Sequence, residues 1–156
     1  MKPKNGGDTR YAVFTGDGYF SEDREPTLYV FDVLGISAYA TTTSSGAQKF
    51  SFQQNDKNKG KLIAKISVQS DCGCKGIANR QSLSPPAVVD IDGDEIADIV
   101  YAGDYRGNLY RFDLRKADPS QWKATKIFAA GQLDRQGYPS QPITTAPVVY
   151  LSLIHI

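Results

Sequence analysis

The sequence predicts an all-β fold, and two observations support that expectation. The 156 residues include nine Tyr and seven Phe but one Trp and one Met, and Tyr and Phe favour the pleated, half-buried surfaces of strands. Apolar runs are short and are separated by Gly, Asp, Pro and Asn, which is typical of strands joined by turns. In chain order we expect strands at Tyr11–Thr15, Thr27–Val33, Lys49–Gln53, Leu62–Gln69, Ala87–Asp90, Asp98–Ala102, Asn108–Leu114, Thr125–Ala129 and Pro147–Leu151.

Two connections between these strands have distinctive compositions. Gly35–Ala47 is rich in Ser and Thr, whose side chains bond to nearby backbone groups, and we predict a loop there. Asn55–Gly60 combines Asn, Asp, Lys and Gly, and we predict an exposed turn.

A β-hairpin pattern occurs twice in the chain. Each copy has a strand ending in Gly-Asp, a connection, and a second strand ending in Phe-Asp and an apolar residue. The first strands of the two copies are Val13–Gly18 and Val100–Tyr105, and the second strands are Leu28–Val33 and Leu109–Leu114. Gly107 and Asn108 in the tighter connection tolerate the positive φ of a short hairpin turn.

A second repeat is also present, because Ser84–Val89 resembles Thr145–Val149. The equivalent residues Val88 and Val148 are separated by 60 positions. Repeated sheet units that cannot bury both faces alone need neighbours, as in a propeller. Residues 1–150 are therefore expected to be a fragment of one β-propeller domain. This incomplete propeller would hold about two blades of four-stranded antiparallel sheet plus part of a third. A small sandwich with similar hairpins is the alternative.

The strongest chemical pattern is the acidic loop Asp90–Asp98, which has carboxylates at its first, third, fifth and ninth positions. Two carboxylates about 4 Å apart repel by roughly 4 kcal/mol at an effective dielectric of about 20, so such crowding favours a bound cation. Calcium takes six to eight oxygen ligands, whereas magnesium demands tighter octahedral geometry and zinc prefers nitrogen or sulfur. We therefore predict a Ca²⁺ site with the ligands Asp90, Asp92, Asp94, the carbonyl of Ile96, and Asp98.

Two features qualify the calcium prediction. Many such loops have Gly at the sixth position, where the backbone bends with positive φ, but here Glu95 must adopt that bend at some cost. A solvated acidic turn that binds no metal is the alternative. Because the loop joins two strands, we expect calcium to have a structural or regulatory role and not a catalytic one.

Composition excludes several functions. Eighteen basic and 17 acidic residues give a net charge of +1, which argues against a nucleic-acid partner. The chain lacks a run of about 18 apolar residues, so we expect no membrane span. The one histidine, His155, lies in residues 151–156, which resemble translated sequencing adapter and are expected to be a non-native tail. Without it a Ser-His-Asp or Cys-His nucleophile cannot form, and we do not expect an enzyme.

Cys72 and Cys74 have one residue between them, which is not the spacing of a redox or zinc pair. A disulfide, local or to another segment, and free thiols both remain open. Met1–Gly7 has a charged start without an apolar segment, which taken alone indicates a cytoplasmic protein. We expect instead that the chain belongs to a longer exported protein whose signal sequence lies outside it.

Ser82–Leu114 resembles the C-terminal β-propeller of the PilY family. The resemblance rests on the acidic loop and on the motifs Tyr-Ala-Gly-Asp, Gly-Asn-Leu-Tyr and Arg-Phe-Asp-Leu. Gln141–Val149 is similar to the start of that family's next blade, and Val13–Val33 to its preceding one. The family comprises type IV pilus biogenesis factors and tip-associated adhesins. Its calcium loop corresponds to Asp90, Asp92, Asp94, Ile96 and Asp98 here.

The resemblance implies that calcium regulates pilus extension against retraction, and thereby twitching motility and surface attachment. It implies an extracellular or cell-surface location and, as partners, minor pilins or the pilus tip, and a host or surface receptor. Two rival families share parts of the pattern. An FG-GAP or integrin-like calcium repeat protein would carry such a loop in each blade, and a quinoprotein dehydrogenase would carry repeated Trp motifs, whereas this chain has Trp122 alone.

Overall fold

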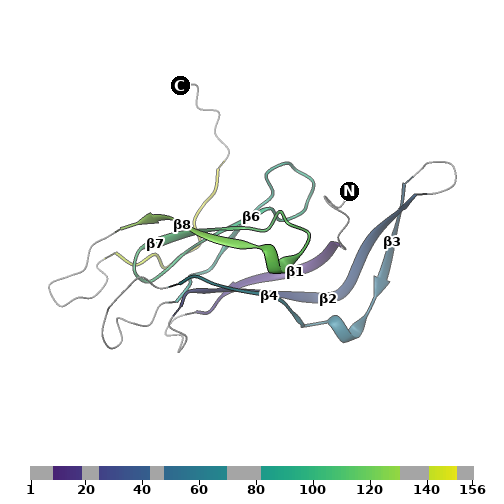
Figure 1. Cartoon of the computed structure of the whole chain (residues 1–156), viewed down its shortest axis with the longest axis horizontal. Helices are drawn as coiled ribbons and strands as arrows, with labels where there is room; N and C mark the ends of the chain where they lie inside the picture. The colour runs from purple at the N-terminus through teal and green to yellow at the C-terminus, as the bar shows by residue number, and fades with distance from the viewer. Residues whose placement is uncertain (1–8, 19–24, 43–47, 70–81, 131–140, 151–156) are drawn as a thin grey trace, which may run out of the picture.

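The computed structural model describes residues 9–18, 25–42, 48–69, 82–130 and 141–150. Within them the chain forms two four-stranded antiparallel sheets and two 3₁₀ turns, which confirms the predicted all-β class (Figure 1). The first sheet contains β1 (Thr9–Gly16), β2 (Thr27–Thr42), β3 (Gln48–Gln54) and β4 (Leu62–Ser67). The second contains β5 (Ala87–Val89), β6 (Ile99–Gly103), β7 (Asn108–Asp113) and β8 (Lys123–Ala129). The turns are η2 (Asp56–Asn58) and η4 (Pro119–Gln121).

The second sheet is a simple meander in the order β5-β6-β7-β8, as expected for one propeller blade. In the first sheet β1 pairs with β2, and β2 in turn pairs with both β4 and β3. The two predicted hairpins are confirmed as β1–β2 and β6–β7, and they share one register. Equivalent pairs are Val13 opposite Phe31 and Val100 opposite Phe112, then Gly16 opposite Leu28 and Gly103 opposite Leu109.

The loop prediction for Gly35–Ala47 is wrong for residues 35–42, which continue β2, while residues 43–47 lie outside the described part. This half of β2 pairs with β3 from Ile36 opposite Gln54 to Thr42 opposite Gln48. The Ser and Thr content suggested a loop, but Thr, Tyr and Ile favour extended backbone once a partner strand is present. Gly35, with φ of 63°, marks the irregularity between the two halves.

The predicted strand Pro147–Leu151 is also not found: residues 147–150 are irregular, and Leu151 lies outside the described residues. Within the described ranges no strand pairs with this segment, and an extended segment without a partner lacks the ladder that makes it a strand. The exposed turn predicted at Asn55–Gly60 is confirmed, because it holds the exposed 3₁₀ turn η2.

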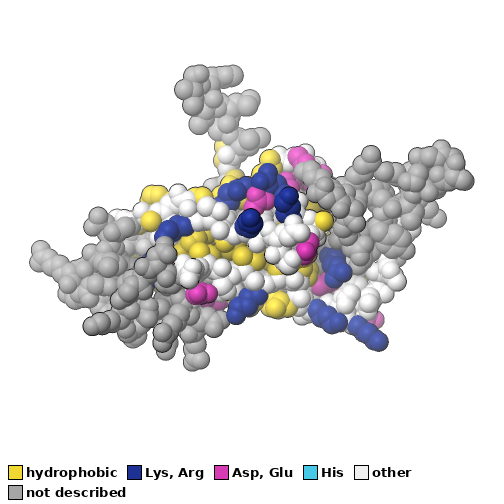
Figure 2. All heavy atoms as spheres, in the orientation of Figure 1, with side chains coloured by type: hydrophobic (Ala, Val, Ile, Leu, Met, Phe, Trp, Pro, Cys, Tyr) yellow, Lys and Arg dark blue, Asp and Glu magenta, His cyan; other side chains and the backbone are white. Residues whose placement is uncertain are grey.

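The core lies between the two sheets, which pack face to face without closing into a ring. Alternation along each strand sends every second side chain to this interface. Figure 2 shows hydrophobic side chains as a band across the middle of the visible face. The buried residues of the core itself are Leu28, Val30, Ala64, Leu83, Val100, Ala102, Tyr110, Phe112 and Leu114.

Trp122 packs against the core cluster, and its indole Nε1 donates to the Lys116 carbonyl at 2.8 Å. Among the described residues no helix is long and apolar enough to cross a membrane. Cys72, Cys74, His155 and the tail at 151–156 lie outside the described residues, so the predictions made for them stay untested.

Candidate metal centre

The acidic loop connects β5 to β6, and both of its ends are tied into the second sheet. Asp98 donates its backbone N–H to the Val89 carbonyl at 3.0 Å, which closes the base of the loop. The Asp98 carbonyl accepts the N–H of Leu114 at 2.8 Å, so the end of β7 is bonded to the same residue. The Asp98 side chain is 3% exposed and its Oδ2 accepts from the Ile91 N–H at 3.0 Å. Asp98 therefore anchors the loop to the sheet.

Three of the predicted ligands come together at this point. Asp90, Asp92 and Asp98 each offer a carboxylate oxygen, and these oxygens lie within 4.8 Å of one another. Calcium–oxygen distances of about 2.3–2.6 Å allow two ligands of one ion to be up to about 5 Å apart, so this spacing fits a shared Ca²⁺. Asp90 and Asp92 are exposed, which leaves one side of the cluster open to water ligands.

Asp94 does not belong to this three-carboxylate group. Its Oδ1 accepts from the N–H of Ile96 at 3.0 Å, which is the bond of an Asx-type turn that shapes the loop. The carboxylates brought together are thus those at the first, third and ninth positions of the pattern. Ile96 is half-buried, and it takes part through its N–H in the contact just described.

The ionisation of Asp90 suits a cation site. Desolvation raises the pKa of its carboxyl, but backbone N–H groups, led by those of Glu95 and Gly93, outweigh this and lower the pKa below its usual value. Glu95 donates to Oδ2 at 2.7 Å and Gly93 to Oδ1 at 2.8 Å. Because the lowered pKa favours the charged form, Asp90 is a carboxylate at neutral pH.

Glu95 adopts the bend expected at the sixth position, with φ of 65°, and among the described residues it is the one non-glycine residue with positive φ. A side chain in this region costs about 1–2 kcal/mol. We predict that Glu95→Gly is more stable than Glu95→Ala by about 1 kcal/mol, because both remove the carboxylate and only glycine relieves the strain. Urea unfolding in a chelating buffer measures the difference. Equal stability of the two variants would show that the bend is not strained.

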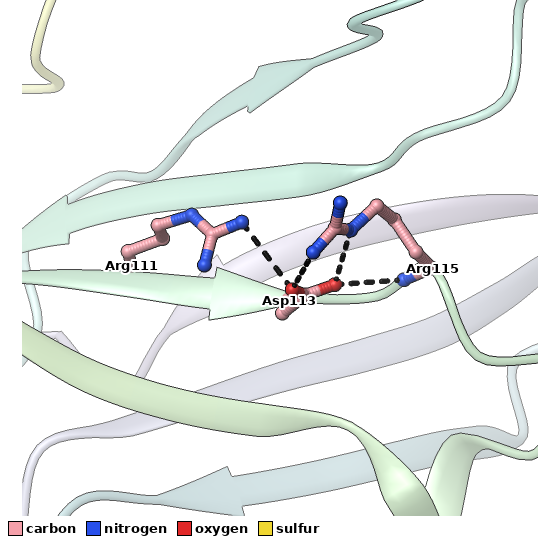
Figure 3. A network of polar contacts seen from close by, with 3 residues as sticks. All are labelled: Arg111, Asp113 and Arg115. Atoms are coloured by element: carbon pink, nitrogen blue, oxygen red, sulfur yellow. Dashed lines mark hydrogen bonds and ion pairs between the residues drawn. The ribbon is translucent and has the colours of Figure 1, made fainter.

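A basic pair adjoins the loop at the end of β7 (Figure 3). Arg115 donates to both oxygens of Asp113, from Nε at 2.9 Å and from a terminal nitrogen at 2.5 Å, and Arg111 adds a contact at 3.3 Å. The Arg115 bonds hold the pKa of Asp113 far below its usual range. The same bonds raise the pKa of Arg115, and the charge of Asp98 adds to the effect.

These bonds from Arg111 and Arg115 to Asp113 form an arginine clamp that was not predicted from the sequence. The Arg115 N–H also donates to Asp113 Oδ1 at 3.2 Å, which is a turn bond at the end of the strand. The signal that could have revealed the clamp is the alternation Arg-Phe-Asp-Leu-Arg, which brings Arg111 and Arg115 to either side of Asp113. The clamp fixes the strand end whose next residue, Leu114, bonds to Asp98.

Two antiparallel sheets share one core, are built from one repeated hairpin and carry an acidic loop between the first two strands of one sheet, and this arrangement defines a segment of a β-propeller. The chain belongs to the PilY1 β-propeller family: the family model described as the PilY1 beta-propeller domain matches residues 30–149. This membership confirms the resemblance stated from the motifs and decides among the three propeller families considered.

Individual relatives agree with the family. The type IV pilus biogenesis factor PilY1 of Pseudomonas aeruginosa is 34% identical over 133 residues, which cover 83% of this chain and 9% of that protein. A PilY1 homolog of Xylella fastidiosa is 36% identical over 73 residues, covering 40% of this chain and 5% of the relative. The crystal structure of the P. aeruginosa PilY1 C-terminal domain aligns with a TM-score of 0.59 and 26% identity, over 90% of this chain and 28% of that one. This chain therefore spans less than a tenth of the length of these curated relatives.

Proposed function

We propose that this chain is the calcium-binding β-propeller segment of a type IV pilus biogenesis factor. The observation that carries the proposal is the convergence of Asp90, Asp92 and Asp98 where β5 meets β6. All three are ligands of the type that Ca²⁺ prefers, and one of them is buried and bonded to both neighbouring strands. The role is binding and not catalysis.

The mechanism follows from the position of the loop. A bound ion draws two exposed carboxylates toward the buried Asp98, and Asp98 is bonded through its backbone to Val89 before the loop and to Leu114 after β7. Calcium thus stiffens the approach of β5 to β6 and the end of β7 together. In the whole protein this coupling makes the blade a calcium-dependent element that regulates pilus extension against retraction and surface attachment.

The proposed location and partners rest on the family resemblance, and the relatives are named as type IV pilus biogenesis factors. We place it at the cell surface or outside the cell, exported by a signal sequence. Its partners are minor pilins at the pilus tip, with a host or surface receptor as a further contact.

Calcium should raise the thermal midpoint of the full chain, and the double variant Asp90→Ala/Asp98→Ala should show no rise. Ligand binding to the folded state alone stabilises it by about 2.7 kcal/mol at a concentration 100 times Kd. Differential scanning calorimetry with added Ca²⁺ or with chelator measures the shift.

Asp118→Ala is the matched control, because Asp118 is an exposed aspartate that accepts the Ser120 N–H at the start of η4, away from the loop. This variant should keep the full calcium shift. A shift in the double variant equal to that of the unchanged chain would remove the site from these residues.

A further inference from the structure

The end of β7, beside the acidic loop, carries a cluster of three charged side chains with a net positive charge. Asp113 accepts bonds from both Arg111 and Arg115, so two positive charges surround one negative charge. The Arg115 bonds hold the pKa of Asp113 far below its usual range, and this carboxyl is therefore ionised at neutral pH. One positive charge of the cluster is thus left over, and its position relative to the loop decides what it does.

Arg111 lies on the side of Asp113 that is farther from the loop. In the pairing of β6 with β7, Asp113 is opposite Ile99 and Arg111 is opposite Tyr101. Ile99 directly follows the last residue of the loop, so Tyr101 is the third residue beyond it. At about 3.3 Å per residue, the backbone of Arg111 is about 10 Å along the strand from the end of the loop.

Arg115 lies on the opposite side of Asp113, as Figure 3 shows. It directly follows Leu114, whose N–H donates to the Asp98 carbonyl at 2.8 Å, so this is the side next to the loop. The Arg115 side chain is 53% exposed, but its bonds to both oxygens of Asp113 keep the guanidinium at the strand end. The bond to Asp113 is the main cause of the raised pKa of Arg115, and the charge of Asp98 contributes to it.

The loop that faces this charge is strongly acidic. Its nine residues include five with carboxylates, namely Asp90, Asp92, Asp94, Glu95 and Asp98. The charge of the ligands is one of the factors that set calcium affinity, and the tightest sites have dissociation constants of about 1–10 nM. A site that binds so tightly keeps its ion when the calcium concentration falls. A regulatory site needs weaker binding, and a fixed cation next to the loop provides it without the loss of a ligand.

We propose that Arg115 weakens calcium binding by the acidic loop, so that the bound ion can leave when the calcium concentration falls. This inference rests on the proposed calcium site. The positive charge of Arg115 repels the divalent ion, and the bonds to Asp113 fix that charge on the loop side of the strand end. The repulsion acts through space and needs no contact with the ion. Arg115 is not itself a ligand, because a guanidinium group has no lone pair to offer.

A purely structural role of Arg115 would have the opposite effect on calcium binding. If Arg115 acted only by holding the end of β7 beside Asp98, its removal would loosen the loop and weaken calcium binding. The removal of a repelling charge strengthens binding instead. The direction of the change in the dissociation constant therefore separates the two roles.

Isothermal titration calorimetry of the full chain with Ca²⁺ measures this dissociation constant. At an ionic strength of about 0.01 M, Arg115→Gln should lower the Kd about threefold. This is the effect that Coulomb's law gives for a unit charge and a divalent ion about 8–10 Å apart in water. At about 1 M salt the Debye length falls to about 3 Å, so the difference between the variant and the unchanged chain should nearly vanish.

Two further variants serve as controls. Arg111→Gln removes the same charge and a bond to the same carboxylate, but on the side away from the loop, so it should change the Kd less than about 1.5-fold. Arg115→Lys keeps the charge and loses the planar fork that binds both oxygens of Asp113, and its Kd should stay close to that of the unchanged chain. Both arginines are partly exposed, so circular dichroism should show the same fold in all variants.

The results that would overturn this inference differ from those that would overturn the calcium site. A Kd of Arg115→Gln that is unchanged or higher would overturn the inference alone. The same holds for an equal fall in Arg111→Gln, or for a fall in Arg115→Gln that persists at high salt. A chain that takes up no calcium would overturn the proposed function and the inference together.

Discussion

Replacing Asp104 by alanine should lower the free energy of unfolding by about 3–4 kcal/mol. The carboxylate is fully buried and accepts four hydrogen bonds, and each donor left unpaired away from water costs about 1–3 kcal/mol. The donors are the N–H groups of Arg106 and Asn108, the Asn108 amide and the Tyr110 hydroxyl, at 2.8–2.9 Å. The Tyr110 bond is buried, and the remaining donors lie closer to the surface.

Two further variants separate the network from the loss of volume. Asp104→Asn keeps the shape but turns an N–H₂ toward groups that are themselves donors, and it should cost nearly as much as alanine. Tyr110→Phe removes one donor together with its hydroxyl and should cost about 1 kcal/mol. Urea denaturation gives all three values. A loss below 1 kcal/mol in Asp104→Ala would mean that water replaces the carboxylate in the turn.

The Asp104 turn also shows how much of the fold the sequence could predict. Repetition of Gly-Asp at the end of one strand and of Phe-Asp at the end of the next predicted both hairpins, although the two connections differ in length. Asp104 holds its own hairpin turn through the bonds from the N–H groups of Arg106 and Asn108. Its equivalent Asp17 accepts the N–H of Leu83, which is 66 residues away. Local spacing carries no information on such a contact.

The outer half of β2 was missed for a related reason. Residues 35–42 have a composition that suits either a loop or a strand, and the choice depends on the partner strand β3. Strand propensity depends on such context more than helix propensity does. The same holds in reverse for Pro147–Tyr150, whose sequence matches a strand but whose partner is not among the described residues.

The candidate metal centre was predictable as a set but not ligand by ligand. Alternate carboxylates in a loop with a bend at Glu95 predicted the convergence of Asp90, Asp92 and Asp98. The same spacing could not show that Asp94 bonds to the Ile96 N–H. An aspartate can either bind a metal or accept the backbone N–H two residues later, and the sequence pattern is the same in both cases. Nor could it place Arg115, whose long side chain reaches Asp113 by a choice of rotamer.

Phe112→Ala should destabilise the chain by about 3–5 kcal/mol, which is the range for removing a buried aromatic ring from a core. Phe112 is fully buried in β7, lies between Val100 and Ala124 on the neighbouring strands, and belongs to the cluster that joins both sheets. The cavity would open at the interface of the two sheets, so the variant would weaken the packing that holds the two sheets together. Urea denaturation measures the change.

Phe128→Ala provides the comparison for this prediction, because Phe128 is a phenylalanine of the adjacent strand β8 that is 56% exposed. Its removal should cost less than about 1 kcal/mol, since a surface side chain leaves no cavity. A similar cost for the two variants would mean that the sheets do not pack on Phe112. The face-to-face arrangement of the two sheets that buries Phe112 would then be wrong.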